Sequence, residues 1–282
     1  MRRRDFATAF AAAGLASAQT QPAVQRKGRL KQCFTRGVFD PKMPFEDMCR
    51  EAARLGLKGA DLIRSQDWPT LRKYGLIPTM APPNAGVSIA NGINQKENHD
   101  AIEKSTRAAI DECAAGGCPN LITVSGNRRG MPDAEGAVNC VAFLNRIKAY
   151  AEDKGVTMCL ELLNSKIDHK DHMCDHSAWG LDVVKRVNSP RVKLLYDIYH
   201  MQIMEGDVCR TIKDNIQWIA HFHTGGVPGR HEIDDTQELN YRFVAKTMVD
   251  AGFTGYVAHE YRPAAGRDPI QSLNQAIDIM DV

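Results

Sequence analysis

The sequence lacks an excess of charge of either sign. Its 282 residues include 36 lysines and arginines against 34 aspartates and glutamates, which gives a formal net charge of +2. It also lacks a basic run interleaved with aromatic residues, the pattern typical of nucleic-acid binding. No polybasic cluster is present that an anionic membrane surface would attract. The charge pattern therefore favours a small-molecule partner, with no nucleic acid and no stable membrane anchor, and leaves open whether the chain forms a homo-oligomer.

Several sequence motifs are also missing. The eight cysteines form no C-x-x-C pair, so neither a zinc ribbon nor a thioredoxin-type redox site is indicated. We expect most of them to be buried as small apolar residues. There is no G-x-G-x-x-G turn for a dinucleotide. No serine or cysteine has an evident base partner that would make it a nucleophile.

No apolar run reaches the length of about 20 residues that a membrane-spanning helix needs. The N-terminus instead has a basic start (MRRRDF), a short weakly apolar stretch (ATAFAAAGLASA) and an Ala-Ser-Ala site at residues 16–18. This order predicts a signal peptide over residues 1–18, and the paired arginines favour twin-arginine export to the periplasm or the medium. Residues 19–29 would then be a linker. The alternative is an alanine-rich helix with a basic cap.

From residue 30 onward, strand-like and helix-like segments alternate. The expected strands are residues 30–34, 59–63, 76–80, 120–125, 156–162, 192–197, 216–223 and 255–260. Helical segments lie between them, among them residues 134–154 and 207–214. The alternation and the strand count predict a single α/β domain over residues 30–282, a (β/α)8 TIM barrel. An open doubly wound sheet is the second choice.

Four of the apolar runs end in a side chain that can bind a metal. VTMCLE ends in Glu161, VKLLYD in Asp197, IQWIAHFH in His223 and GYVAHE in Glu260. The carboxyl ends of the strands of a parallel barrel converge on one face, where barrel enzymes carry out their chemistry. Two Glu, one Asp and one His suit a hard or borderline divalent cation. The sequence therefore predicts one divalent ion (Mg, Mn, Co or Zn) at these residues, against the alternatives of buried salt bridges and a core histidine.

Two polar residues follow closely on these strand ends. His200 stands three residues after Asp197, and Arg230 follows a tight turn in VPGRHE. A loop arginine can hold a carboxylate or a sugar oxygen with its fork of donors. We expect both residues to contact the substrate, rather than to be a helix-start histidine and a surface arginine. His221 is expected to be structural, and residues 167–176 to form a loop over the barrel mouth. Weaker candidates for the site are Asn164, Trp179, His231 and Glu232.

This set of groups is suited to proton transfer beside a carbonyl. A metal polarises a carbonyl or hydroxyl oxygen, while a carboxylate removes a proton from the neighbouring carbon and a carboxylate returns it. Return to the adjacent carbon is isomerisation through an enediolate. Return to the other face of the same carbon is epimerisation.

At these residues the chain resembles the hydroxypyruvate isomerase family of the xylose-isomerase-like barrel superfamily. The resemblance rests on LELLN at 160–164, KLLYDIYHMQIMEGD at 193–207, HFHTGGVPGRHE at 221–232 and GYVAHEY at 255–261. It implies the metal ligands named above, acid–base roles for Glu161 and Glu260, and substrate contacts at His200 and Arg230. The isomerases often carry Gln at the position of His223, where the related ketose 3-epimerases use His.

The sequence thus supports one main hypothesis, a metal-dependent isomerase acting on a small hydroxy-carbonyl or sugar. A ketose 3-epimerase acting on an exported sugar derivative is the alternative within the same chemistry. A metal-dependent phosphodiesterase shares the fold, but it would require more histidine ligands and a basic face. A non-catalytic secreted sugar-binding barrel would not require two glutamates at one metal.

Overall fold

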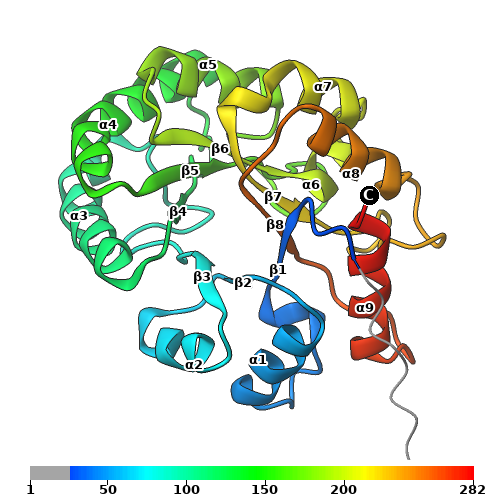
Figure 1. The fold of residues 1–282 in the computed structure, drawn as a ribbon. Coiled ribbons are helices and arrows are strands. Elements are labelled where there is room, and N and C mark those ends of the chain that lie inside the picture. Colours follow the sequence, from blue (N-terminus) through cyan, green and yellow to red (C-terminus); the bar gives the residue numbers. More distant parts are fainter. Residues whose placement is uncertain (1–25) are drawn as a thin grey trace, which may run out of the picture.

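The computed structural model describes residues 26–282 (Figure 1). The predicted signal peptide, residues 1–18, and the first part of the predicted linker lie outside this range. Eight parallel strands form one sheet in the order β3-β2-β1-β8-β7-β6-β5-β4. The strands are β1 (Lys31–Phe34), β2 (Gly59–Asp61), β3 (Ile77–Met80), β4 (Asn120–Thr123), β5 (Thr157–Glu161), β6 (Val192–Asp197), β7 (Ile219–Thr224) and β8 (Tyr256–His259). All eight strands predicted from the sequence are present.

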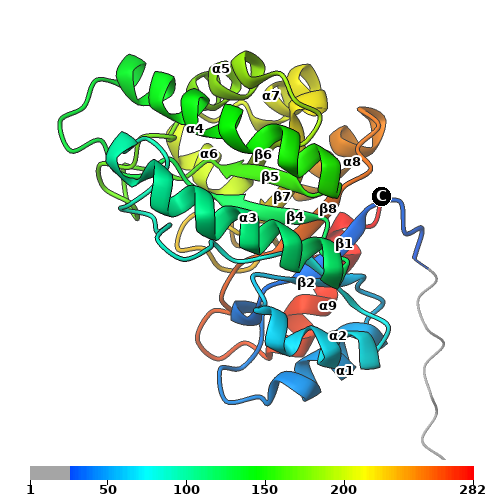
Figure 2. The same cartoon turned by 90° about the vertical axis from the view of Figure 1, so that its left-hand side faces the viewer.

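The helices lie outside the ring of strands, as Figures 1 and 2 show. They are α1 (Phe45–Arg54), α2 (Trp68–Lys73), α3 (His99–Gly116), α4 (Asp133–Lys154), α5 (Ser177–Val187), α6 (Ile198–Met204), α7 (Val208–Asn215), α8 (Tyr241–Asp250) and α9 (Pro269–Met280). The two longest, α3 and α4, each end at a glycine in the left-handed region, Gly117 and Gly155, where a side chain would be strained. Within residues 26–282, no helix has both the length and the apolar character needed to cross a membrane.

The barrel is nearly closed. Its ring is completed between β3 and β4 by one parallel bridge, Ala81 to Leu121. The side-chain amide of Asn120 reinforces this contact by donating to the carbonyl oxygen of Thr79 at 2.8 Å. Since β1 pairs with both β2 and β8, the two ends of the strand series meet. The open doubly wound sheet is therefore the wrong choice for this chain.

One helix was not expected from the sequence. Helix α6 begins immediately after β6, and its first turn is capped by the Asp197 carboxylate, which accepts from the backbone N–H of His200 at 3.2 Å. The segment IYHMQIM is short, and its capping residue Asp197 was interpreted as a strand-end ligand rather than as a helix start. The predicted helix at 207–214 is also present, as α7.

The inside of the barrel carries a small apolar layer beneath the predicted site. Cys159 and Leu195 belong to it, and each lies two residues before a predicted ligand on the same face of its strand. The expectation for the cysteines is confirmed, because all eight are free thiols and seven of them are buried. The polar residues at the strand ends thus lie directly above a packed apolar layer inside the barrel.

A substitution at Gly59 tests how tightly β2 and β3 are packed. A β-carbon at this position would lie 2.2 Å from the carbonyl oxygen of Ile77. We expect Gly59→Ala to lower the free energy of unfolding by about 1–3 kcal/mol, the usual cost of overpacking, as measured by urea denaturation. Gly37→Ala is the control, because its β-carbon would meet nothing closer than 3.5 Å. Equal stability of the two variants would contradict this description of the packing.

Candidate active site

The four predicted metal ligands converge at the carboxyl ends of neighbouring strands. Glu161 ends β5, Asp197 ends β6, His223 lies in β7 and Glu260 directly follows β8. One ligand atom from each residue lies within 4.8 Å of the others. The Nδ1 atom of His223 is 2.6 Å from Glu260 Oε2, 3.7 Å from Glu161 Oε1 and 3.8 Å from Asp197 Oδ2. The predicted convergence is therefore found in the structure.

The donor atoms at this point suit a divalent cation. His223 Nδ1 is buried and has no hydrogen-bond partner, although it forms a close ion-pair contact with Glu260. Three carboxylates surround this nitrogen, and carboxylate oxygen together with imidazole nitrogen is a common ligand set for Mg, Mn, Co or Zn. A divalent ion bound there would use the unpartnered nitrogen and offset the carboxylate charge.

The carboxyl groups of the site differ strongly in their electrostatics. Burial raises the pKa of Glu161 to about 8, and the charge of Glu260 adds to the effect. Burial also raises the pKa of Asp197. For Glu260 burial acts in the same direction, but His223 and Arg230 outweigh it and hold its pKa well below the usual value. Glu161 is thus the carboxylate with the least compensation from the residues around it.

Arg230 and His200 stand beside the ligands, on the active face where they were predicted. The Nη2 atom of Arg230 donates to Asp197 Oδ2 at 2.5 Å and to Glu260 Oε2 at 2.6 Å. Its Nη1 donates to His200 Nε2 at 2.8 Å. Because a guanidinium only donates, His200 accepts at Nε2, and burial together with Arg230 holds the pKa of His200 well below its usual value. Whether the two residues contact a substrate stays a prediction.

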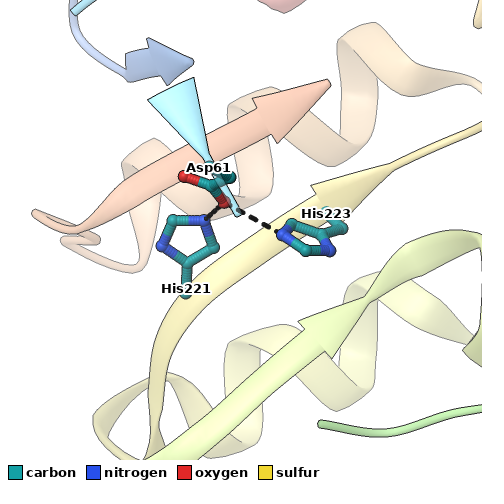
Figure 3. Close-up of side chains that lie close together, drawn as sticks. All are labelled: Asp61, His221 and His223. Carbon is teal, nitrogen blue, oxygen red and sulfur yellow. Dashed lines mark hydrogen bonds and ion pairs between the residues drawn. The ribbon is translucent and has the colours of Figure 1, made fainter. Parts of the chain in front are cut away.

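Asp61 also belongs to this site, although it is not among the predicted site residues. Figure 3 shows its carboxylate between two histidines of β7. Asp61 Oδ2 is 3.0 Å from His223 Nε2 and 2.6 Å from His221 Nε2, and Thr79 donates its hydroxyl to the other oxygen. Burial alone would raise the pKa of Asp61, but the histidines lower it to about 2. The only signal in the sequence was an acid within the apolar run GADLI.

The contact with Asp61 fixes how His223 presents its ring. A carboxylate only accepts, so Nε2 of His223 carries the hydrogen and Nδ1 is turned toward the three other carboxylates. Carboxylates behind metal-binding histidines commonly have this role. The trio Asp61, His221 and His223 is itself a candidate metal cluster. One of its contacts, from His223 Nε2 to Asp61 Oδ2 at 3.0 Å, is a hydrogen bond, and the other is a close approach of His221 Nε2 to the same oxygen at 2.6 Å.

A pocket of about 640 Å³ opens beside the ligand cluster. Arg230 and Glu260 line it, and Ile167, Asp168 and His169 contribute from the predicted mouth loop. The other weak candidates have different roles. The Asn164 amide lies 2.7 Å from His200 Nδ1 and so supports the site. The remaining three weak candidates, Trp179, His231 and Glu232, are engaged elsewhere. Trp179 donates to the carbonyl oxygen of Asp133, and His231 Nδ1 lies 2.8 Å from the carbonyl oxygen of Arg262. Glu232 accepts from the hydroxyl of Ser272.

Comparison with known proteins identifies relatives of most of the barrel. Residues 49–281 match a family model described as a xylose isomerase-like TIM barrel. The 2-oxo-tetronate isomerase of Cupriavidus necator is 38% identical over 116 residues, 41% of this chain and 44% of that protein. The match thus spans less than half of that relative's length. The 2-oxo-tetronate isomerase of Haemophilus influenzae is 26% identical over 240 residues, 79% of this chain and 89% of that protein.

Solved structures share the fold. A crystal structure of an AP endonuclease of family 2 from Brucella melitensis superposes with a TM-score of 0.79 at 23% identity, over 88% of this chain and 98% of the other. A D-psicose 3-epimerase crystallised in the presence of D-fructose gives a TM-score of 0.71 at 17% identity, over 90% and 100%. At these identities the likeness extends to the fold alone.

The Asp61 contact leads to a prediction for metal affinity. The Asp61→Asn variant replaces a carboxylate, which only accepts hydrogen bonds, with an amide that can also donate. The ring of His223 is then no longer held in one orientation with its hydrogen on Nε2. We expect the affinity for Mn or Zn to fall about 10–100-fold, as measured by competition with a chromogenic chelator. Asp182→Asn is the control, because Asp182 pairs with Arg186 on the exposed face of α5. Unchanged affinity in Asp61→Asn would show that Asp61 does not orient the ligand.

Proposed function

Since the chain belongs to the xylose isomerase-like TIM barrel family, we propose that it is a metal-dependent isomerase of the hydroxypyruvate isomerase type. Its substrate would be a small hydroxy-carbonyl compound. The observation that carries the proposal is the unpartnered Nδ1 of His223, surrounded by three carboxylates and adjoining a pocket large enough for such a molecule. The 2-oxo-tetronate isomerases named above support the same class of reaction.

The residues that would hold the ion are Glu161, Asp197, His223 and Glu260. A divalent ion bound there polarises a carbonyl or hydroxyl oxygen and stabilises the negative charge that develops during proton transfer. Arg230 supplies only one positive charge, and it bonds to two of the three carboxylates. The donor set therefore calls for additional positive charge, which a divalent cation provides.

Glu161 and Glu260 are the proposed acid–base pair. They enter the site from β5 and β8, and Glu260 lines the pocket. One carboxylate would remove a proton from the carbon beside the carbonyl and one would return it. Arg230 donors and the His200 ring would hold the oxygens of the substrate, while the buried Asp197 carboxylate keeps Arg230 in position. Return of the proton to the adjacent carbon completes an isomerisation through an enediolate.

A ketose 3-epimerase is the second candidate. It would use the same side chains but return the proton to the other face of the same carbon. The histidine at position 223 favours it, because hydroxypyruvate isomerases often carry Gln at this position whereas ketose 3-epimerases use His. The fold is also shared with the D-psicose 3-epimerase. A phosphodiesterase is less well supported, because a net charge of +2 provides no basic surface for a nucleic acid.

Hydrogen exchange in deuterated water tests the acid–base assignment. We expect the metal-loaded protein to exchange the hydrogen on the carbon beside the carbonyl of hydroxypyruvate or a ketose, as followed by NMR. Glu161→Gln and Glu260→Gln should each slow this exchange by about 10²–10⁴-fold, since an amide cannot accept the proton. Glu135→Gln, at an exposed position on α4, is the matched control.

The carbon that exchanges also separates the candidate functions. Appearance of the isomeric carbonyl compound supports isomerisation, and inversion at the exchanging carbon supports epimerisation. Exchange that proceeds at the normal rate in both glutamate variants contradicts the acid–base roles. Binding of the compounds without exchange at any carbon would point to a sugar-binding barrel.

Removal of metal gives an independent prediction. Chelation with EDTA should abolish exchange and lower the melting temperature, because an ion at 100 times its Kd stabilises the folded state by about 2.7 kcal/mol. Adding back Mg, Mn, Co or Zn should restore both properties, as followed by calorimetry and the NMR assay. EDTA already saturated with the same ion that is bound to the protein serves as the control. A melting temperature that does not respond to chelation or to any of the ions would contradict the proposed metal site.

A further inference from the structure

We propose that Arg262, together with Arg36, forms a subsite that binds a carboxylate group of the substrate. The inference rests on the proposed function and deepens it, because it assigns the substrate to the hydroxy acids rather than the neutral sugars. It goes beyond the ligand cluster, since neither arginine contacts the four candidate ligands. Both line the same pocket as Arg230 and Glu260.

The backbone of Arg262 is held in a fixed place relative to the cluster. Its N–H donates to the carbonyl oxygen of Arg230 at 2.9 Å, and its own carbonyl oxygen lies 2.8 Å from His231 Nδ1. Arg262 follows Glu260 by only two residues, so their backbones are separated by at most about 7 Å. A short molecule can therefore have one end beside Glu260 and the other beside Arg262.

Of the three arginines that line the pocket, two form ion pairs with carboxylates and one does not. Arg230 is neutralised by Asp197 and Glu260. Arg36 pairs with Asp67 at 2.6 Å. Among residues 26–282, no carboxylate forms an ion pair with Arg262, whose side chain is exposed to solvent.

The acidic groups of the pocket are already engaged. Asp61 accepts from His223 and lies 2.6 Å from His221 Nε2, and Asp168 accepts from Asn164 and from the Tyr199 hydroxyl at 2.8 and 2.9 Å. The pocket therefore has one guanidinium without an anionic partner. A carboxylate on the substrate would supply that partner.

Arg36 lies on the same wall as Arg262. A β-carbon on the neighbouring Gly37 would lie 3.9 Å from Arg262 Cγ, so the loop after β1 packs against the loop after β8. The Arg36 guanidinium is stacked over the ring of Phe45 at 4.0 Å, which restricts its movement. The planar fork of an arginine also matches the geometry of a carboxylate.

Binding of glycerate and of its methyl ester tests the proposal directly. The two probes have the same carbon skeleton apart from the ester methyl, but only glycerate has the negative charge, and neither requires turnover. We expect the metal-loaded protein to bind glycerate about tenfold more tightly than the ester, as measured by isothermal titration calorimetry. Arg262→Gln should remove that preference, Arg262→Lys should keep part of it, and Arg36→Gln should reduce it.

Arg267→Ala is the matched control. Arg267 is an exposed arginine of the same loop, but it pairs with Asp234 and does not line the pocket beside the metal ligands. This variant should keep the full preference for glycerate. In turnover, Arg262→Gln should raise KM for hydroxypyruvate about tenfold while leaving kcat, and the KM for a neutral ketose, within about twofold of the original values.

Two results would overturn the proposal. One is equal affinity of the unaltered protein for glycerate and the ester. The other is a preference that survives in Arg262→Gln, because the carboxylate would then be bound by the metal instead. Since the probes do not react, the absence of isomerase activity would refute the proposed function and leave this binding result interpretable.

Discussion

The structure depends on one electrostatic constraint, the burial of three carboxylates around a single imidazole nitrogen. Glu161, Asp197 and Glu260 face His223 Nδ1 at the end of the barrel, and burial of such groups is costly unless charge and hydrogen bonds compensate. Arg230 compensates part of this charge from the pocket side. The arrangement is electrostatically complete only with a further cation, which is why metal chemistry explains the site better than a structural ion-pair network does.

The barrel meets this constraint by providing rigid positions from four consecutive strands. Parallel pairing places the carboxyl ends of β5, β6, β7 and β8 side by side, so the side chains at or next to these ends meet at one place. A fifth strand, β2, contributes Asp61 from across the ring and sets the orientation of His223. Loops then add the groups that would meet a substrate. This division between rigid ligands and adjustable loops is typical of the fold.

Much of this could be predicted from the sequence, because the strand-to-helix alternation and the strand-end residues are local patterns. Glu161, Asp197, His223 and Glu260 were recognisable because each ends an apolar run. The role of Asp61 could not be predicted, since its partners lie 160 and 162 residues away and only barrel closure brings them together. The bonds from Arg230 to two ligands and the free guanidinium of Arg262 also depend on packing between loops, for which one sequence has no periodic signal.

The central claim is that the four strand-end residues form one metal site. The most direct test is an anomalous difference map from a crystal of the protein soaked in Mn or Zn. The account predicts one strong peak per chain, within coordination distance of Glu161, Asp197, His223 Nδ1 and Glu260. A peak held instead by Asp61 and His221, or a map without any peak at the barrel mouth, would contradict it.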